Sequence, residues 1–219
     1  MIIIPSINTD SFEEVKEKIK LVEPYVSWVH LDVADGTFTK NTTWHNASDL
    51  NFLETPLNIE VHLMISNVDR RINDWLIPKV KRIFFHLSAS NDPDFVIEQC
   101  KKNNIEAGIA ISPDESWTKA AHFKGKVNIF QILRVHPGPA GQKATEETFE
   151  RIKEMRKFCP SCIIEVDGGM NMETAKKARE AGADIIVAAN YIFSAQGGPA
   201  SGWNNNYGQH ISELKGEKT

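Results

Sequence analysis

The sequence predicts an α/β protein of one domain, residues 1–219, whose parallel strands close into a (β/α)8 barrel, also called a TIM barrel. Three observations support this fold. Short apolar runs alternate with amphipathic stretches nearly from end to end, which is typical of repeated βα units. The runs are almost continuously apolar, as expected for a parallel sheet that is covered on its outside. At 219 residues, closure into one barrel is favoured over an open doubly wound sheet.

Eight runs that are rich in β-branched and aromatic residues provide the predicted strands. The first begins almost at the start of the chain, and the last ends just before residue 190. In chain order, the predicted strands are 2–7, 26–33, 58–64, 80–87, 105–111, 127–135, 162–167 and 183–189.

The stretches between these runs have helical patterns with recognisable ends. The first begins with Asp10 or Ser11 as its cap and has two acidic residues in its first turn. The last is preceded by Asn171 as a cap and closed by Gly182. The predicted helices are 10–23, 68–76, 93–103, 114–122, 145–158 and 172–181, and 45–54 has the weakest helical pattern. Residues 197–219 form a polar C-terminal tail, either an ordered cover or a frayed end.

The charge of the chain argues against two classes of partner. Lys plus Arg number 25 and Asp plus Glu 29, which gives a formal net charge of -4, and no long basic run is present. Nucleic acid and anionic membranes are therefore not expected partners. The start lacks a basic signal region, and no apolar stretch approaches the ~20 residues of a membrane helix. We therefore expect a soluble, cytoplasmic protein.

The chain has three cysteines, and this odd number argues against a disulfide framework. Two of them form the sequence Cys159-Pro160-Ser161-Cys162. A redox motif of this spacing opens a helix, whereas this one follows a helical pattern and enters a strand. A zinc site would need a second pair of ligands. We therefore expect a structural segment without redox or metal chemistry.

Polar residues gather at the C-terminal ends of the predicted strands. In a TIM barrel these ends, with the loops that follow them, form the active site. Polar side chains in an apolar strand are costly unless they are paired or bound to a ligand. The residues at such ends are Ser6, His30, Asp32, His62, His86, His136, Asp167 and Asn190.

Four of these residues are suited to a divalent metal. His30, Asp32, His62 and Asp167 offer two imidazoles and two carboxylates, a mixed N/O set typical of Zn, Fe, Mn or Co. Two carboxylates at one metal also provide an acid and a base, which can remove a proton from one face of a carbon and return it on the other. A lone histidine more often has a structural role, and we expect that role for His86 and His136, although both face the same mouth.

Five segments stand in an order and placement that are highly specific. These segments are Pro5-Ser6-Ile7, His30-Leu31-Asp32-Val33-Ala34-Asp35-Gly36-Thr37-Phe38, Val61-His62-Leu63-Met64, Val135-His136-Pro137-Gly138-Pro139-Ala140-Gly141-Gln142 and Glu165-Val166-Asp167-Gly168-Gly169-Met170. Through them the chain resembles the ribulose-phosphate 3-epimerase family over nearly its whole length.

The resemblance implies an isomerase that needs one divalent metal ion (Zn, Fe, Mn or Co) and by default interconverts D-ribulose 5-phosphate and D-xylulose 5-phosphate. It implies that His30, Asp32, His62 and Asp167 bind the metal, and that Asp32 and Asp167 act as the acid/base pair around a metal-stabilised enediolate. The residues expected to contact the phosphorylated ketose are Ser6, His62, Met64, Gly138, Pro139, Ala140, Gly141, Gly168, Gly169, Ala189 and Asn190. We also expect a homo-oligomer.

Several positions on this rim depart from the family's pattern. The loop 138–141 and Ala189-Asn190 replace the usual glycine-rich phosphate contacts, and Arg134 replaces a small hydroxyl residue. Arg134, Lys40 or His45 are candidates to bind a repositioned or additional anionic group. The alternative is that Arg134 points outward between the barrel and the helices, since neighbouring strand residues alternate faces. The changes predict weaker turnover of ribulose 5-phosphate than of a longer or differently substituted ketose phosphate.

Two other functions stay open at this point. One is epimerisation of another sugar phosphate, such as a six-carbon ketose phosphate or a glycan-precursor sugar. The other is a non-catalytic barrel that binds a sugar phosphate. The presence of both carboxylates and both histidines argues against it, because binding alone needs no acid/base pair. Trp44 and Trp203 lie in predicted loops and are candidates to cover the pocket.

Overall fold

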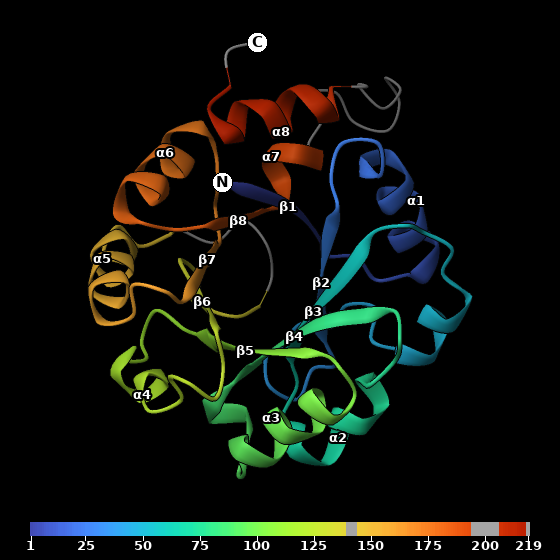
Figure 1. Cartoon of the computed structure of the whole chain (residues 1–219). Helices are drawn as coiled ribbons and strands as arrows, with labels where there is room; N and C mark the ends of the chain where they lie inside the picture. Colours follow the sequence, from blue (N-terminus) through green and yellow to red (C-terminus); the bar gives the residue numbers. More distant parts are fainter. Residues whose placement is uncertain (139–143, 194–205, 218–219) are drawn as a thin grey trace.

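The structure is a computed structural model that describes residues 1–138, 144–193 and 206–217. In this part of the chain eight parallel strands form a closed barrel in the order β1 to β8, surrounded by helices (Figure 1). The predicted TIM barrel is therefore confirmed. The strands are β1 (Ile2–Ile7), β2 (Trp28–Ala34), β3 (Asn58–Met64), β4 (Val80–His86), β5 (Glu106–Ile111), β6 (Ile129–Leu133), β7 (Ile163–Asp167) and β8 (Ile185–Ala188).

The helices follow the strands in alternation, as the sequence pattern predicts. The α-helices are α1 (Phe12–Val22), α2 (Val68–Trp75), α3 (Pro93–Lys102), α4 (Thr118–Ala121), α5 (Thr148–Phe158), α6 (Met172–Ala181), α7 (Asn190–Phe193) and α8 (Tyr207–Lys215). Two short 3-10 helices, η1 (Ala47–Phe52) and η2 (Leu87–Ala89), follow β2 and β4. None of the helices in the described ranges is both long enough and apolar enough to span a bilayer.

Helix ends are fixed by side chains that the sequence marks. Ser11 caps α1 by accepting a hydrogen bond from the Glu14 amide at 3.3 Å. Asn171 caps α6 in a capping box with Thr174, and Gly182 closes that helix with a φ of 106°. A left-handed closing residue favours glycine because it has no Cβ.

Apolar side chains form two layers on either side of the barrel wall. The larger layer packs between the strands and the helices. The smaller one lies inside the barrel and includes Ile4, Phe84, Ala110, Ile129, Ile185 and Val187. Gly108 on β5 makes room for Phe84, because an added Cβ would lie 2.5 Å from its ring Cδ1. Successive strand residues alternate between the two layers.

Three predicted segments differ from the structure in detail. The 114–122 helix shrinks to α4, because Glu115 N donates to Ser112 O at 3.0 Å and closes a turn first. The weak 45–54 pattern contains the 3-10 helix η1. Within the polar tail, α8 buries Tyr207, Ile211 and Leu214 and is an ordered cover.

The argument from the odd number of cysteines against a disulfide is wrong, because Cys159 and Cys162 form a disulfide. Cys159 is the C-cap of α5, and the turn that follows brings the two Cα atoms to 5.4 Å, within the range for a disulfide. The third cysteine, Cys100, is free and buried in α3. Cys100 therefore accounts for the odd number of cysteines and takes no part in the disulfide.

Candidate active site

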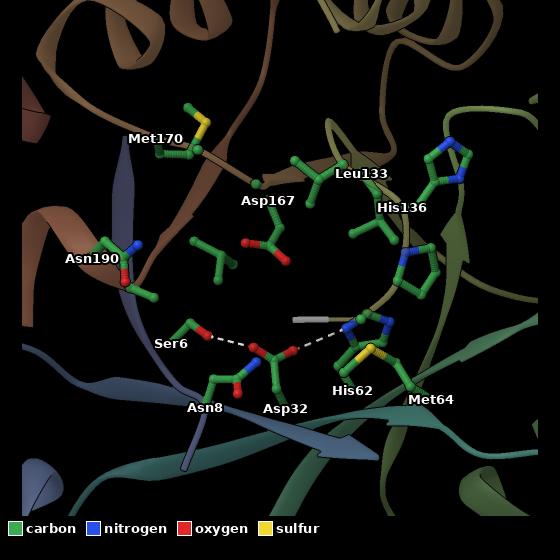
Figure 2. A pocket seen from close by; sticks show the side chains of 17 residues that line it. Ser6, Asn8, Asp32, His62, Met64, Leu133, His136, Asp167, Met170 and Asn190 are labelled. Atoms are coloured by element: carbon green, nitrogen blue, oxygen red, sulfur yellow. Dashed lines mark hydrogen bonds and ion pairs between the residues drawn. The ribbon is translucent and has the colours of Figure 1, made fainter. Parts of the chain in front are cut away.

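A pocket opens at the C-terminal ends of the strands (Figure 2). Ser6 and Asn8 reach it from β1 and the residues after it, Asp32 from β2, and Asp167 from β7. The carboxylates of Asp32 and Asp167 approach from opposite sides of the cavity (Figure 2). Parallel strands that start at one rim of a barrel also end together, so residues distant in sequence meet here.

The four predicted metal ligands lie in one cluster. His30, Asp32, His62 and Asp167 each offer a nitrogen or oxygen atom, and these atoms all lie within 4.8 Å of one another. Register explains part of the grouping, since Asp32 on β2 pairs directly with His62 on β3. His30 lies one inward position deeper on β2 and is fully buried.

Asp32 is held from three directions. Ser6 Oγ donates to its Oδ2 at 2.8 Å, as Figure 2 shows. Its Oδ1 lies 3.2 Å from His62 Nδ1 and 3.4 Å from His30 Nε2. Burial alone disfavours the ionised carboxylate, but the two imidazoles outweigh it and hold the pKa of Asp32 far below its ordinary value.

Asp167 has a different electrostatic environment. Burial and the charge of Asp32 raise the pKa of Asp167 to about 7. Two carboxylates in one pocket cannot both ionise easily without a compensating cation. The pair therefore resembles a site that a divalent cation would neutralise.

His30 is the more deeply buried imidazole. One of its ring nitrogens contacts a carboxylate, and the other has no hydrogen-bond partner among the described residues. Its Nδ1 lies 2.7 Å from Glu60 Oε1 on β3, and both side chains are inaccessible to solvent. Its Nε2 is buried and has no hydrogen-bond partner among the described residues. Burial opposes protonation, but Asp32 and Glu60 raise the pKa of His30 well above its ordinary value. A buried, unpartnered nitrogen aimed at two carboxylates fits a missing metal ion.

The second imidazole, His62, belongs to a chain of buried polar groups. Its Nε2 lies 2.9 Å from His86 Nε2, and His86 Nδ1 lies 3.3 Å from Ser112 Oγ. Burial lowers the pKa of His62, and that of His86 more strongly. Neutral rings fit one consistent pattern, in which His62 donates to His86 and His86 donates to Ser112. That pattern leaves His62 Nδ1 free to bind a cation.

Backbone amides line the opposite side of the pocket. Gly168 and Gly169 follow β7 with φ values of 108° and 60°, and Gly138 has a φ of 143°. An added Cβ at Gly168 would lie 3.0 Å from Val135 Cγ2, so the loop packs tightly. Successive amides in such a turn are suited to an anion.

Arg134 lies beneath this glycine turn and does not enter the pocket. Its side chain is 2% exposed, and Nη1 donates to Gly168 O at 3.1 Å and to Gly169 O at 3.0 Å. The guanidinium stacks over Phe149 with 5.0 Å between its carbon and the ring centre. Burial lowers the pKa of Arg134. The outward orientation, one of the two considered for this residue, is the one observed.

The structure brings most predicted site residues together. Those that line the pocket are Ser6, Asp32, His62, Met64, Gly138, Asp167, Gly168, Gly169, Ala189 and Asn190, while His30 lies just below it. The predicted contacts Pro139, Ala140 and Gly141 lie outside the described residues, as does Trp203.

Other candidates lie elsewhere. Lys40 and His45 are exposed and do not line this pocket. Trp44 is buried against Phe12 and Trp75, so it is a core residue rather than a cover.

Sequence reasoning missed several residues. Asn8 and Met170 line the pocket, and so does His136, for which a structural role was expected. Asn8 and Met170 follow strand ends, and the rule that found Ser6 and Asp167 could have found them. Glu60 and Arg82 interrupt apolar strands with charge, which was a usable signal that was not followed.

Comparison with known proteins agrees with this geometry. The family model described as "Ribulose-phosphate 3 epimerase family" matches residues 2–193. A ribulose-phosphate 3-epimerase of Chlamydia trachomatis is 34% identical over 81% of this chain and 79% of its own length. One from Methanocaldococcus jannaschii is 32% identical over 86% and 82%. A chloroplastic ribulose-5-phosphate-3-epimerase of Arabidopsis thaliana is 29% identical over 100% and 77%.

Solved structures support the fold. A 3-hexulose-6-phosphate synthase has a TM-score of 0.69 at 14% identity, with 99% of each chain covered. A 3-keto-L-gulonate-6-phosphate decarboxylase from Vibrio cholerae has a TM-score of 0.72 at 10% identity, covering 99% of this chain and 95% of its own. At these identities the likeness concerns the barrel alone. The family model and the close relatives, in contrast, cover most of the chain, which therefore belongs to the ribulose-phosphate 3-epimerase family, isomerases that act on carbohydrates.

Proposed function

We propose that this protein is a metal-dependent 3-epimerase that interconverts D-ribulose 5-phosphate and D-xylulose 5-phosphate. The observation that carries the proposal is the pair of carboxylates, Asp32 and Asp167, on opposite sides of one pocket (Figure 2). Epimerisation needs a proton removed from one face of C3 and returned on the other. The names of the relatives support the pentose phosphates as the default pair.

We assign the metal to His30, Asp32, His62 and Asp167. The fit rests on their N/O donor set within 4.8 Å and on the unpartnered Nε2 of His30. Zn, Fe, Mn and Co all accept such ligands. When bound, the divalent cation supplies Lewis-acid stabilisation of the charge that develops on the sugar oxygens as the C3 proton leaves.

The two aspartates perform the proton transfers. One carboxylate accepts the C3 proton from its face of the sugar, and the other, in its protonated form, donates a proton to the opposite face. The roles exchange when the reaction runs in reverse. Ser6 holds Asp32 through the 2.8 Å hydrogen bond and so fixes the direction of that carboxylate.

The glycine turn and Asn190 are suited to the phosphate. Gly138, Gly168 and Gly169 present backbone to the pocket, and Asn190 adds a side-chain amide beside Ala189. Amides in turns of positive φ bind anions without needing a charged side chain. The phosphate end of a pentose would lie against this side while C3 lies between the aspartates.

The case for a longer substrate loses one of its two supports in the described residues. It rested on the changed loop 138–141 and Ala189-Asn190, of which residues 139–141 lie outside the described ranges, and on Arg134, Lys40 or His45 contacting an extra anionic group. Arg134 is engaged with the carbonyls of the glycine turn, and neither Lys40 nor His45 lines the pocket. Ribulose 5-phosphate therefore stays the default substrate. The expected homo-oligomer stays a prediction.

The decisive experiment follows deuterium from D2O into C3, read by NMR, across five-, six- and seven-carbon ketose phosphates. We expect wash-in with inversion for ribulose 5-phosphate, and loss of inversion in Asp32→Asn and Asp167→Asn. Asp94→Asn, which removes an exposed carboxylate on α3, is the matched control and keeps full activity.

Two results would contradict the proposal. Near-wild-type turnover by either aspartate variant would eliminate the two-base mechanism. Absence of exchange with every ketose phosphate, in protein that holds its metal, would favour a non-catalytic binding barrel. A clear preference for a longer sugar would replace the substrate but keep the reaction.

A further inference from the structure

A second cluster of charged groups lies inside the barrel, directly beneath the pocket. His30, Glu60 and Glu165 have side chains with no solvent exposure, and that of Arg82 is 7% exposed. They come from strands β2, β3, β7 and β4. Next to them inside the barrel lie the apolar side chains of Ile4, Phe84 and Ile129 and the buried amide of Gln131. Charges buried this deeply are costly unless each is paired, so their partners determine what the cluster does.

The cluster has the ligands of a metal site but already contains a side-chain cation. His30, Glu60 and Glu165 could together hold an ion. Arg82, however, places Nη1 2.7 Å from Glu60 Oε2 and 3.8 Å from Glu165 Oε2. A guanidinium keeps its charge at any ordinary pH. The cation of this cluster is therefore Arg82, and a second metal would have to displace it.

The contact from Glu60 to His30 determines which imidazole nitrogen is available. Glu60 Oε1 lies 2.7 Å from His30 Nδ1, a length typical of a charge-assisted hydrogen bond. If Nδ1 carries the proton and donates it, Nε2 has its lone pair free, and Nε2 is the atom that faces Asp32. Histidines that bind metals usually donate their other N–H to a carboxylate, which fixes the ring and raises its basicity.

Resting on the metal binding proposed above, we infer that Glu60 is a positioning residue that orients His30 toward the metal, and that Arg82 holds Glu60 in place. Arg82 is itself fixed on its other side, where Nε donates to Glu106 Oε2 at 2.7 Å. Its guanidinium carbon also lies 4.5 Å from the centre of the Trp28 ring. The line Glu106, Arg82, Glu60, His30 thus runs from the partly exposed end of β5 to the metal cluster.

Glu165 occupies the same layer but has another task. Its Oε1 accepts a hydrogen bond from Gln131 Nε2 at 3.0 Å and lies 4.0 Å from His30 Nδ1, too far for a hydrogen bond. Glu165 is therefore not expected to orient His30. This difference between two equally buried glutamates allows a matched test.

The test measures the metal affinity of the full-length protein by competition with a chelator, using Zn2+ and Co2+, together with the visible spectrum of bound Co2+. Glu60→Gln keeps the size of the side chain and removes its charge. We expect its metal affinity to fall by about 10–100-fold, with a changed Co2+ spectrum, as is typical when the partner of a ligating histidine is lost. Glu165→Gln is expected to keep the wild-type affinity and spectrum.

A folding defect is separated from a positioning defect by a second variant. Glu60→Gln leaves Arg82 without its buried partner, which by itself destabilises a protein. Glu60→Gln with Arg82→Met removes both charges of the 2.7 Å pair. Glu106, which also contacts Arg82, is partly exposed and can be hydrated, and burial raises the pKa of Glu165 well above its ordinary value, which favours a neutral carboxyl that needs no guanidinium. We expect this double variant to recover the thermal unfolding midpoint of the metal-free protein while keeping the low metal affinity.

The outcomes separate this inference from the proposed function. Wild-type protein that binds no divalent metal would refute both. Wild-type protein that binds metal, with Glu60→Gln binding equally well, would refute the positioning role alone. A double variant that regains wild-type affinity would also refute it, because the loss would then come from the unpaired Arg82. Equal losses of metal affinity in Glu60→Gln and Glu165→Gln would also refute it, because the effect would then not depend on the carboxylate that contacts His30.

Discussion

Replacement of Arg134 by methionine tests how the phosphate side of the pocket is held. Arg134 is fully covered and its Nη1 donates to the carbonyls of both Gly168 and Gly169. An added Cβ at Gly169 would lie 3.7 Å from that same nitrogen. Methionine replaces the aliphatic stem of arginine but not its guanidinium, and it cannot donate a hydrogen bond. The variant therefore removes the two bonds, together with the guanidinium contacts to Phe149 and Glu146, and keeps the packing of the stem.

The magnitude follows from the contacts. Hydrogen bonds to charged groups contribute about 1.5–3 kcal/mol each, but the loss is partly offset because the guanidinium no longer has to be buried. We expect a net cost of about 2 kcal/mol. If this cost appears as disorder of the glycine turn in the free protein, it corresponds to roughly thirtyfold weaker binding of a phosphate ester.

The assay compares kcat and KM for ribulose 5-phosphate and the inhibition constant of inorganic phosphate. We expect Arg134→Met to raise KM and the phosphate inhibition constant together, with a smaller change in kcat. Arg156→Met is the matched control, since Arg156 also donates to backbone carbonyls, among them Gly182 O at 2.8 Å, but away from the pocket. It should lower stability and leave KM unchanged. Wild-type KM and phosphate inhibition in Arg134→Met would refute the reasoning.

Three further predictions concern metal, thiols and packing. Metal analysis is expected to find about one divalent ion per chain, and His62→Ala and Asp167→Asn to lose it; unchanged content in both would eliminate the ligand assignment. Burial raises the pKa of Cys100 to about 12, so the thiolate is scarce at neutral pH and forms only as pH approaches that value. Thiol reagents should therefore find no reactive group in the native protein and one after unfolding without reductant, whereas three would disprove the disulfide. Gly108→Ala pushes a Cβ against Phe84 and is expected to cost about 1–3 kcal/mol, or roughly 2–12 °C in Tm; an unchanged Tm would show that the ring can move.

The sequence was sufficient for the barrel and for the grouping of His30, Asp32, His62 and Asp167 in one cluster. The pattern of apolar and amphipathic stretches can be read locally, because each strand of the barrel buries both of its faces and each helix buries one face. Once the strands are parallel, their C-terminal ends share a rim, so His62 and Asp167 can be placed together without any coordinates. Asn8 satisfies the same rule and was overlooked.

The direction of a side chain near a strand end is less predictable. Arg134 comes just after β6, where one step along the chain separates the pocket from the outer layer. The sequence allowed both directions, and the hydrogen bonds to the glycine turn settle the outward one. Cys159 and Cys162 show the same limit, since their pairing depends on the turn at the end of α5.

The sequence by itself determined which residues reach the rim, because strand periodicity and parallel topology are properties of local pattern. Only the tertiary structure decided which of the other charged side chains contact one another inside the barrel. Glu60, Arg82 and Glu165 lie on three strands, and no spacing along the chain predicts 2.7 Å between Glu60 and both His30 and Arg82. Such contacts depend on barrel closure and on the register between strands, which bring inward side chains of different strands to one level.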